Sequence, residues 1–227
     1  MNTTIYKLGF WAALAAFIAA AAYSVVQILQ VVGAVRYPWD AIVIYVSSLC
    51  IVIPFLLAML ALHYSVPDEK KIWSHAALLF TVMYAVYVTL NYVVQLATVL
   101  PMSLRGASEQ VRVLDQTPHS LFWDVDALGY IFLGIATLVA VPVFAKQGLQ
   151  RWARWFFLAN GLFTPVIAFV YFYPQFSYGL LLIALPWVIT VPGSMFLLAL
   201  CFQSQLRADA RSSRTVFGTD KRATGSG

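Results

Sequence analysis

Six long runs of apolar residues, separated by short polar linkers, divide most of this chain. They cover residues 8–32, 41–64, 73–100, 120–144, 155–173 and 179–202. A bilayer core is crossed by a helix of about 20 apolar residues, so each run is long enough to span a membrane. Helices satisfy their own backbone hydrogen bonds, which lipid cannot do. The pattern therefore predicts an all-α bundle of six transmembrane helices.

The composition agrees with lipid as the main solvent. Of the 227 residues, 62% are hydrophobic and only 10% are charged, whereas soluble domains are about half apolar and a quarter charged. We predict a membrane domain over residues 1–205 and a disordered cytoplasmic tail over the polar residues 206–227. The first run is longer than the core of a cleaved signal peptide, so we expect it to be retained as a helix.

The positions of the basic residues predict the orientation in the membrane. Of the 14 Lys and Arg residues, all but Arg36, Arg105 and Arg112 fall on the side that holds both termini. Because Lys and Arg favour the cytoplasmic side, both termini are predicted to be cytoplasmic. This placement explains the net charge of +5 without a nucleic-acid partner. The tryptophans lie near predicted helix ends, where their rings favour the interface, except Trp187, which lies deeper.

The fourth run contains two acidic residues, Asp124 and Asp126. The sequence predicts that Thr117 caps this helix. Three residues then share one face: His119, Asp126 and Tyr130. Asp124 points roughly the opposite way and fits the interface near the helix N-terminus. A buried carboxylate costs about 2.5–3.5 kcal/mol at a membrane centre, so we expect Asp126 to have a partner or a polar cavity.

Polar side chains at helical spacing mark one face of the first run and one of the third. They are Tyr23, Gln27 and Gln30 in the first run, and Tyr84, Tyr87, Asn91, Gln95 and Thr98 in the third. In lipid, polar groups turn inward to find hydrogen bonds. Several of these lie at the depth of Asp126, in the outer half, with Tyr171 nearby. Two interpretations stay open: a polar pocket, or hydrogen bonds that only join helices.

Small residues and prolines indicate how the helices pack. Ala12, Ala16 and Ala20 form a ladder on the first helix, which lets another helix approach closely. Prolines remove a backbone donor and bend helices. The second, fifth and sixth spans are expected to bend because they contain Pro54, Pro165, Pro186 and Pro192.

Residue spacing excludes several kinds of site. The three histidines are divided between the two sides of the membrane, so they cannot bind one metal ion. The chain has no HExxH motif, no G-x-S-x-G and no phosphate-binding loop. We therefore predict no metal and no cofactor. Cys50 and Cys201 differ in depth by roughly 20 Å, which is too far for a disulfide.

One stretch resembles a pattern found in uncharacterised bacterial multi-pass membrane proteins of the domain-of-unknown-function type. The pattern is Pro-His-x-x-Phe, then an acidic residue, then Leu-Gly-Tyr. Here it corresponds to residues 118–122, Asp126 and residues 128–130. The resemblance implies a bacterial inner-membrane location and favours Asp126 and His119 over Asp124 as functional residues. It implies no particular activity.

The leading functional hypothesis is a protein that binds, senses or transports a small amphiphilic or lipid-like molecule. The predicted ligand pocket lies in the outer half of the membrane, with His119 at its mouth. Its predicted lining is Gln27, Tyr87, Asn91, Gln95, Asp126 and Tyr130.

Two alternatives stay open. The first is an intramembrane enzyme that acts on an isoprenoid or lipid, with Asp126 as general acid or base and His119 as a second candidate. The second is a structural membrane subunit, or a helix-mediated oligomer, whose partner fills the groove along Ala12, Ala16 and Ala20.

Overall fold

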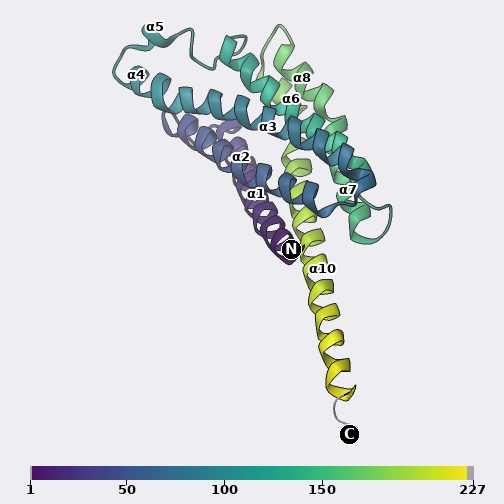
Figure 1. Cartoon of the computed structure of the whole chain (residues 1–227). Helices are drawn as coiled ribbons and strands as arrows, with labels where there is room; N and C mark the ends of the chain where they lie inside the picture. The colour runs from purple at the N-terminus through teal and green to yellow at the C-terminus, as the bar shows by residue number, and fades with distance from the viewer. Residues whose placement is uncertain (1, 224–227) are drawn as a thin grey trace.

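A computed structural model of the protein describes residues 2–223, and these residues form helices and no strand (Figure 1). Six segments are long and apolar enough to cross a membrane, as predicted: Thr3–Val31, Trp39–Ser65, Asp68–Leu104, Leu121–Val143, Gly148–Phe172 and Gly179–Arg211. The α-helices are α1 Asn2–Val31, α2 Trp39–Ser65, α3 Lys71–Val94, α4 Leu100–Leu104, α5 Ser108–Val111, α6 Leu121–Ala140, α7 Gly148–Leu162, α8 Thr164–Phe172, α9 Tyr178–Leu182 and α10 Trp187–Ala223. Asp68–Lys70 and Val141–Val143 are short 3₁₀ turns.

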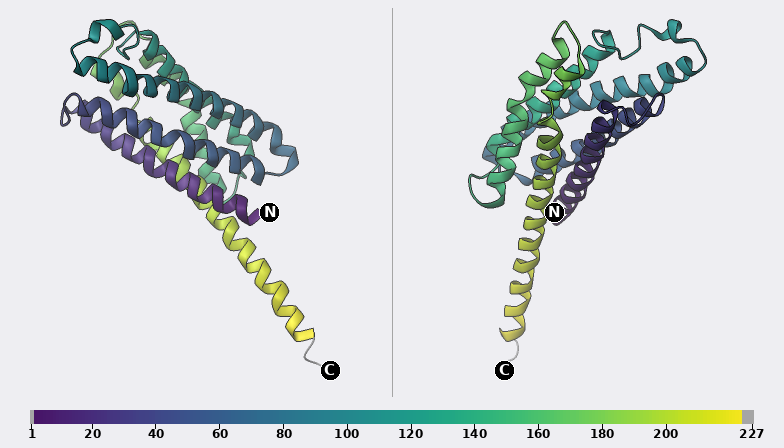
Figure 2. Two further views of the ribbon diagram at one scale, coloured as in Figure 1. Left: turned by 60° about the vertical axis from the view of Figure 1, so that its left-hand side comes forward. Right: turned by 180° about the vertical axis from the view of Figure 1, so that it is seen from behind.

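The six spans form a ring in which each packs against the next along the chain. α1 packs on α2, α2 on α3, α3 on α6, and α6 on α7 and α8. α7 packs on α10, and α10 packs back on α1, as the two views of Figure 2 show. Phe55, Tyr84, Phe157 and Met195 are fully buried inside the ring.

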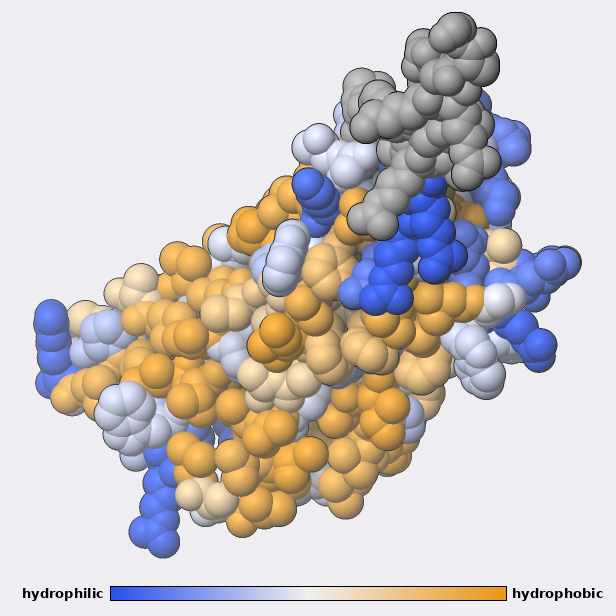
Figure 3. Space-filling view, turned by 90° about the horizontal axis from the view of Figure 1, so that it is seen from below, coloured by the Kyte–Doolittle hydropathy of each residue, from blue (hydrophilic) through white to orange (hydrophobic). Residues whose placement is uncertain are grey.

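The outer surface of the ring is suited to lipid. Ile53, Val86 and Ile189 are each at least 58% exposed. Figure 3 shows apolar side chains across the middle of one face and hydrophilic side chains gathered at its ends. This supports a multi-pass membrane protein, whereas the cytoplasmic position of the termini stays a prediction.

Prolines break the fifth and sixth spans, as expected. The fifth divides at Phe163 into α7 and α8, with Pro165 in the first turn of α8. The sixth divides into α9 and α10, with Pro186 immediately before α10. Proline is tolerated at a helix start, where its missing N–H is not needed. By contrast, α2 continues through Pro54 as one helix.

The third span widens where it leaves the core. Residues Gln95–Val99 form a π-helical turn, and Leu100 N–H donates to Gln95 O. Pro101 follows directly and has no N–H to continue the α-helical pattern. The connection from α4 to α6 contains one further short helix, α5, Ser108–Val111. We call the end of the ring that holds this connection the long-loop end.

The alanine ladder of α1 faces the protein's own helices. Ala16 and Ala20 are completely buried and Ala12 is 6% exposed, because α1 packs against α2 and α10. The expectation that a partner protein fills this groove is therefore wrong. Small side chains serve here to bring helices of the same chain together.

α10 continues beyond the bundle. The sequence predicted a disordered tail from residue 206, whereas the structure describes helix as far as Ala223, and Figure 1 shows this helix leaving the bundle. A helix already formed in the membrane extends at low cost, because each added residue gains a hydrogen bond. Residues 224–227 of the predicted tail lie outside the described residues.

We predict that Gly161→Ala destabilises the bundle. A Cβ added at Gly161 would lie 2.8 Å from the Cα of Leu138, so α6 and α7 would have to separate. Overpacking costs about 1–3 kcal/mol, which exceeds the gain in helix propensity of up to about 1 kcal/mol. The midpoint of thermal unfolding in detergent should fall. The midpoint should not fall in Gly179→Ala, where the nearest neighbouring atom to the added Cβ, Ser177 Oγ, is 3.8 Å away. An equal fall in both variants would contradict this packing.

A cysteine-labelling experiment tests the predicted orientation. With Cys50 and Cys201 replaced by alanine, a cysteine at Gln110, in the long-loop connection, should react with an impermeant reagent on intact cells. A cysteine at Gln147, which is exposed at the opposite end, should react only after the cells are opened. The reverse pattern would place the termini outside.

Candidate functional site

Asp126 is the buried charge around which three helices meet. It lies about one and a half turns into α6 and is 2% exposed. Asn91 of α3 donates its Nδ2–H to Asp126 Oδ1 at 3.1 Å. Tyr171 of α8 donates its hydroxyl to Asp126 Oδ2 at 2.7 Å. Both carboxylate oxygens therefore accept a hydrogen bond from another span, which offsets the cost of burying the group.

The same cluster holds the long-loop connection against α3. Asn91 Nδ2 also donates to Gln116 Oε1 at 2.9 Å. Gln95 Nε2 donates to the Leu114 carbonyl at 2.7 Å, and Gln95 Oε1 accepts from Gln116 N at 3.2 Å. Gln95 belongs to the π-helical turn and is 1% exposed. These bonds satisfy backbone groups of a loop that closes over the end of the bundle.

A second cluster of hydroxyl groups lies beside Asp126. Tyr130, one turn further along α6, hydrogen-bonds through its hydroxyl with Ser48 of α2 at 3.3 Å and with Tyr92 of α3 at 3.0 Å. Its ring meets the edge of Trp187 at a centroid distance of 5.3 Å. Tyr23 of α1 contacts the same Trp187 at 5.5 Å. Trp187 thus fixes tyrosines from two different spans.

Trp123 positions Tyr171. Its indole N–H donates to the Tyr171 carbonyl at 2.9 Å, and the two rings lie 4.7 Å apart. Phe176, in the linker after α8, packs against the edge of Trp123 at 5.4 Å. These contacts hold the end of α8 so that the Tyr171 hydroxyl reaches Asp126.

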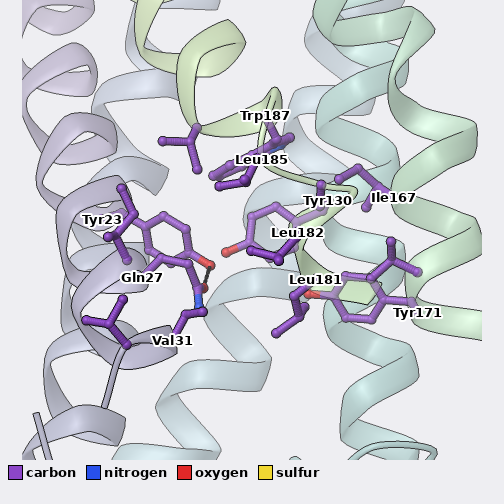
Figure 4. Close-up of a pocket in the computed structure, with 15 residues that line it drawn as sticks. Tyr23, Gln27, Val31, Tyr130, Ile167, Tyr171, Leu181, Leu182, Leu185 and Trp187 are labelled. Atoms are coloured by element: carbon purple, nitrogen blue, oxygen red, sulfur yellow. Dashed lines mark hydrogen bonds between the residues drawn. The ribbon is translucent and has the colours of Figure 1, made fainter. Parts of the chain in front are cut away.

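A cavity of about 360 Å³ lies beside both clusters, between α1 on one side and α8 and α9 on the other. In Figure 4 the Tyr23 and Tyr130 hydroxyls point toward each other across it, and the Tyr171 hydroxyl points inward beside Leu181. Its lining is mostly aliphatic and aromatic: Tyr23, Gln27, Ile28, Val31, Val32, Tyr130, Ile167, Val170, Tyr171, Leu181, Leu182, Ala184, Leu185, Trp187 and Val188.

The structure divides the predicted pocket residues into three groups. Gln27 and Tyr130 line the cavity. Asn91, Gln95 and Asp126 are buried and do not line it: Asn91 bonds with Asp126, while Gln95 bonds with the long loop. The third group is Tyr87 alone, which packs on Phe132 at 5.4 Å and lies against Gly129. It belongs to the contact between α3 and α6.

His119 does not share a helical face with Asp126, and the predicted cap at Thr117 is wrong. α6 begins at Leu121, and Ser120 is its cap, because Ser120 Oγ accepts from Trp123 N at 3.2 Å. His119 precedes the helix, is exposed, and has a backbone φ of +66°. Pro118 suits a first helical position and so favoured Thr117 as the cap, although Ser is the better capping residue.

Several contributors were not predicted as site residues. Tyr92 follows Asn91 directly and therefore lies off the expected polar stripe of α3, while Ser48 and Gln116 carry no helical pattern. The sequence could have indicated Trp187, because it is the tryptophan that lies away from the predicted helix ends. Among the described residues, no group of three or more His, Cys, Asp and Glu side chains comes together to hold a metal ion.

Asp126→Ala is expected to destabilise the protein far more than Asp124→Ala. The first change leaves the Asn91 amide and the Tyr171 hydroxyl without their shared acceptor, and an unpaired buried group costs about 1–3 kcal/mol. Asp124 is exposed in the first turn of α6, where a favourable charge contributes about 0.3–1 kcal/mol. Unfolding in detergent should show a loss of at least about 2 kcal/mol for Asp126→Ala. Equal losses would mean that Asp126 is not held as described.

Comparisons with known proteins do not assign a function to this site. No protein-family model matches the chain, no curated protein is similar to it, and no solved structure matches its fold. The resemblance of residues 118–130 to bacterial membrane proteins stays a prediction. The function therefore has to follow from the geometry of the cavity and the groups behind it.

Proposed function

We propose that this protein binds a small amphiphilic or lipid-like molecule in the cavity between α1, α8 and α9. The observation that carries the proposal is the cavity itself, whose wall is apolar on most sides and holds three tyrosine hydroxyls on the inner side. Its volume of about 360 Å³ falls within the range of about 300–1,000 Å³ that is usual for ligand sites.

The rim of the cavity supports access from the bilayer. Four lining residues are large, apolar and at least 45% exposed: Ile28, Val32, Leu182 and Leu185. They lie at the ends of two membrane spans, where such side chains meet lipid acyl chains. A molecule dissolved in the membrane can therefore reach the cavity sideways, between α1 and α9, without crossing water.

The contacts of Asp126 favour binding over catalysis. Asp126 does not line the cavity, and both of its oxygens already accept hydrogen bonds from Asn91 and Tyr171. A general acid or base has to reach the reacting group of the substrate. We assign Asp126 a positioning role, in which it orients the Tyr171 hydroxyl at the cavity wall. We also propose a bacterial inner-membrane location with cytoplasmic termini, which places the cavity in the outer half.

Native mass spectrometry of the purified protein tests the proposal. The wild type should retain a discrete small molecule, or added hexadecan-1-ol, in addition to bulk lipid. Val188→Phe should reduce this retention by about tenfold or more, which corresponds to about 1.4 kcal/mol, because Val188 lines the cavity and a phenyl ring fills part of it.

The matched control is Ile189→Phe on the neighbouring residue. Ile189 is 67% exposed on the outer face of α10, so this change places the same phenyl ring on the lipid-facing surface. Because the ring introduced is the same and only its position differs, retention should stay unchanged. Equal retention by the wild type and both variants would mean that the cavity is not a binding site.

A further inference from the structure

The cavity wall contains hydrogen-bonding groups but no charged ones. None of its lining side chains is Lys, Arg, His, Asp or Glu. An ionised headgroup would therefore lose its hydration without gaining a partner of opposite charge, which is strongly unfavourable in a low-dielectric site. The carboxyl group of Asp126 lies directly behind Tyr171, so an anionic head meets no counter-charge there.

The polar groups of the wall present both an acceptor and a donor. The Tyr171 hydroxyl donates its hydrogen to Asp126, so its oxygen remains an acceptor toward the cavity. Tyr23 likewise donates to Gln27 Oε1 at 3.0 Å and keeps an accepting oxygen. Gln27 Nε2 donates one hydrogen to Gln30 Oε1 at 3.1 Å, and an amide nitrogen has a second hydrogen to donate.

The polar head of a ligand contributes more to binding preference in a membrane than it does in water. An apolar tail gains little by moving from lipid into an apolar pocket, because lipid tails are as apolar as leucine. The preference for one membrane molecule over another therefore depends on its head and on packing. A head that donates one hydrogen bond and accepts another can pair with both kinds of group in the wall. A head that only accepts gives the Tyr171 oxygen no donor.

We infer that the ligand is an uncharged lipid whose head is a hydroxyl group, such as a long-chain or isoprenoid alcohol. This rests on the proposed function and names its ligand class. At about 30 Å³ for each water-sized group, the cavity of about 360 Å³ holds roughly 12 such groups. The head and the first part of the tail then lie inside, and the rest of the tail leaves between Ile28 and Leu182 into the bilayer.

A set of probes with one tail and different heads tests this inference. The full chain is mixed in detergent with equal amounts of hexadecan-1-ol, hexadecyl methyl ether, hexadecanoate and hexadecyltrimethylammonium, and the retained molecules are quantified by native mass spectrometry. We expect the retained amount of the alcohol to be about tenfold or more above that of each charged probe. It should be about fivefold above that of the ether.

Tyr171→Phe and Tyr173→Phe form the matched pair of variants. Tyr171→Phe removes an accepting oxygen from the cavity wall, so the ratio of retained alcohol to ether should fall toward one. Tyr173 is 42% exposed and does not line the cavity, so Tyr173→Phe should keep the wild-type ratio. Because the readout is a ratio within one sample, partial loss of folded protein does not change it.

The outcomes separate this inference from the proposed function. If Val188→Phe displaces all four probes but the wild type retains them equally, the cavity binds lipid and the hydroxyl preference is wrong. Stronger retention of hexadecanoate than of the alcohol would likewise overturn the preference. If Val188→Phe changes the retention of none of the probes, the proposed function itself fails.

Discussion

The bundle depends on the hydrogen bonds that make the carboxylate of Asp126 tolerable inside a membrane. A charge at this position requires donors, because lipid offers none. Asn91 and Tyr171 supply them from α3 and α8, so one side chain ties the third, fourth and fifth spans together. Asn91 then extends the connection to Gln116 in the long loop. The group that is most costly to bury thus also specifies how its neighbours are arranged.

The breaks in the fifth and sixth spans explain why a cavity lies beside this cluster. α7 packs against α10, whereas α8 packs on α6 and α7, so the ring is held closed near the termini and is looser at the long-loop end. Pro165 and Pro186 lie at the two breaks. The cavity lies beside these breaks, between α1, α8 and α9.

The cavity and the buried cluster meet in two tyrosines. The hydroxyl groups of Tyr130 and Tyr171 form hydrogen bonds inside the protein, and both side chains also line the cavity. Side chains fixed in this way lose little conformational freedom when a ligand binds, which is the benefit of preorganisation. In a membrane, where apolar contact discriminates weakly, such fixed polar groups are the means by which a protein selects one lipid-like molecule from many.

The sequence by itself determined the architecture, because crossing a bilayer imposes a length and an apolar composition that are visible in every span. It also identified Asp126, Asn91 and Gln95 as inward-facing, since polar residues in lipid have few other options. The tertiary structure decided which of these line a cavity. Gln27 and Tyr130 do so, while Tyr87 and His119 do not. Partners such as Tyr92 and Ser48 come from other helices, and helical periodicity describes one helix at a time. Their meeting depends on the rotation of neighbouring spans, which only packing sets.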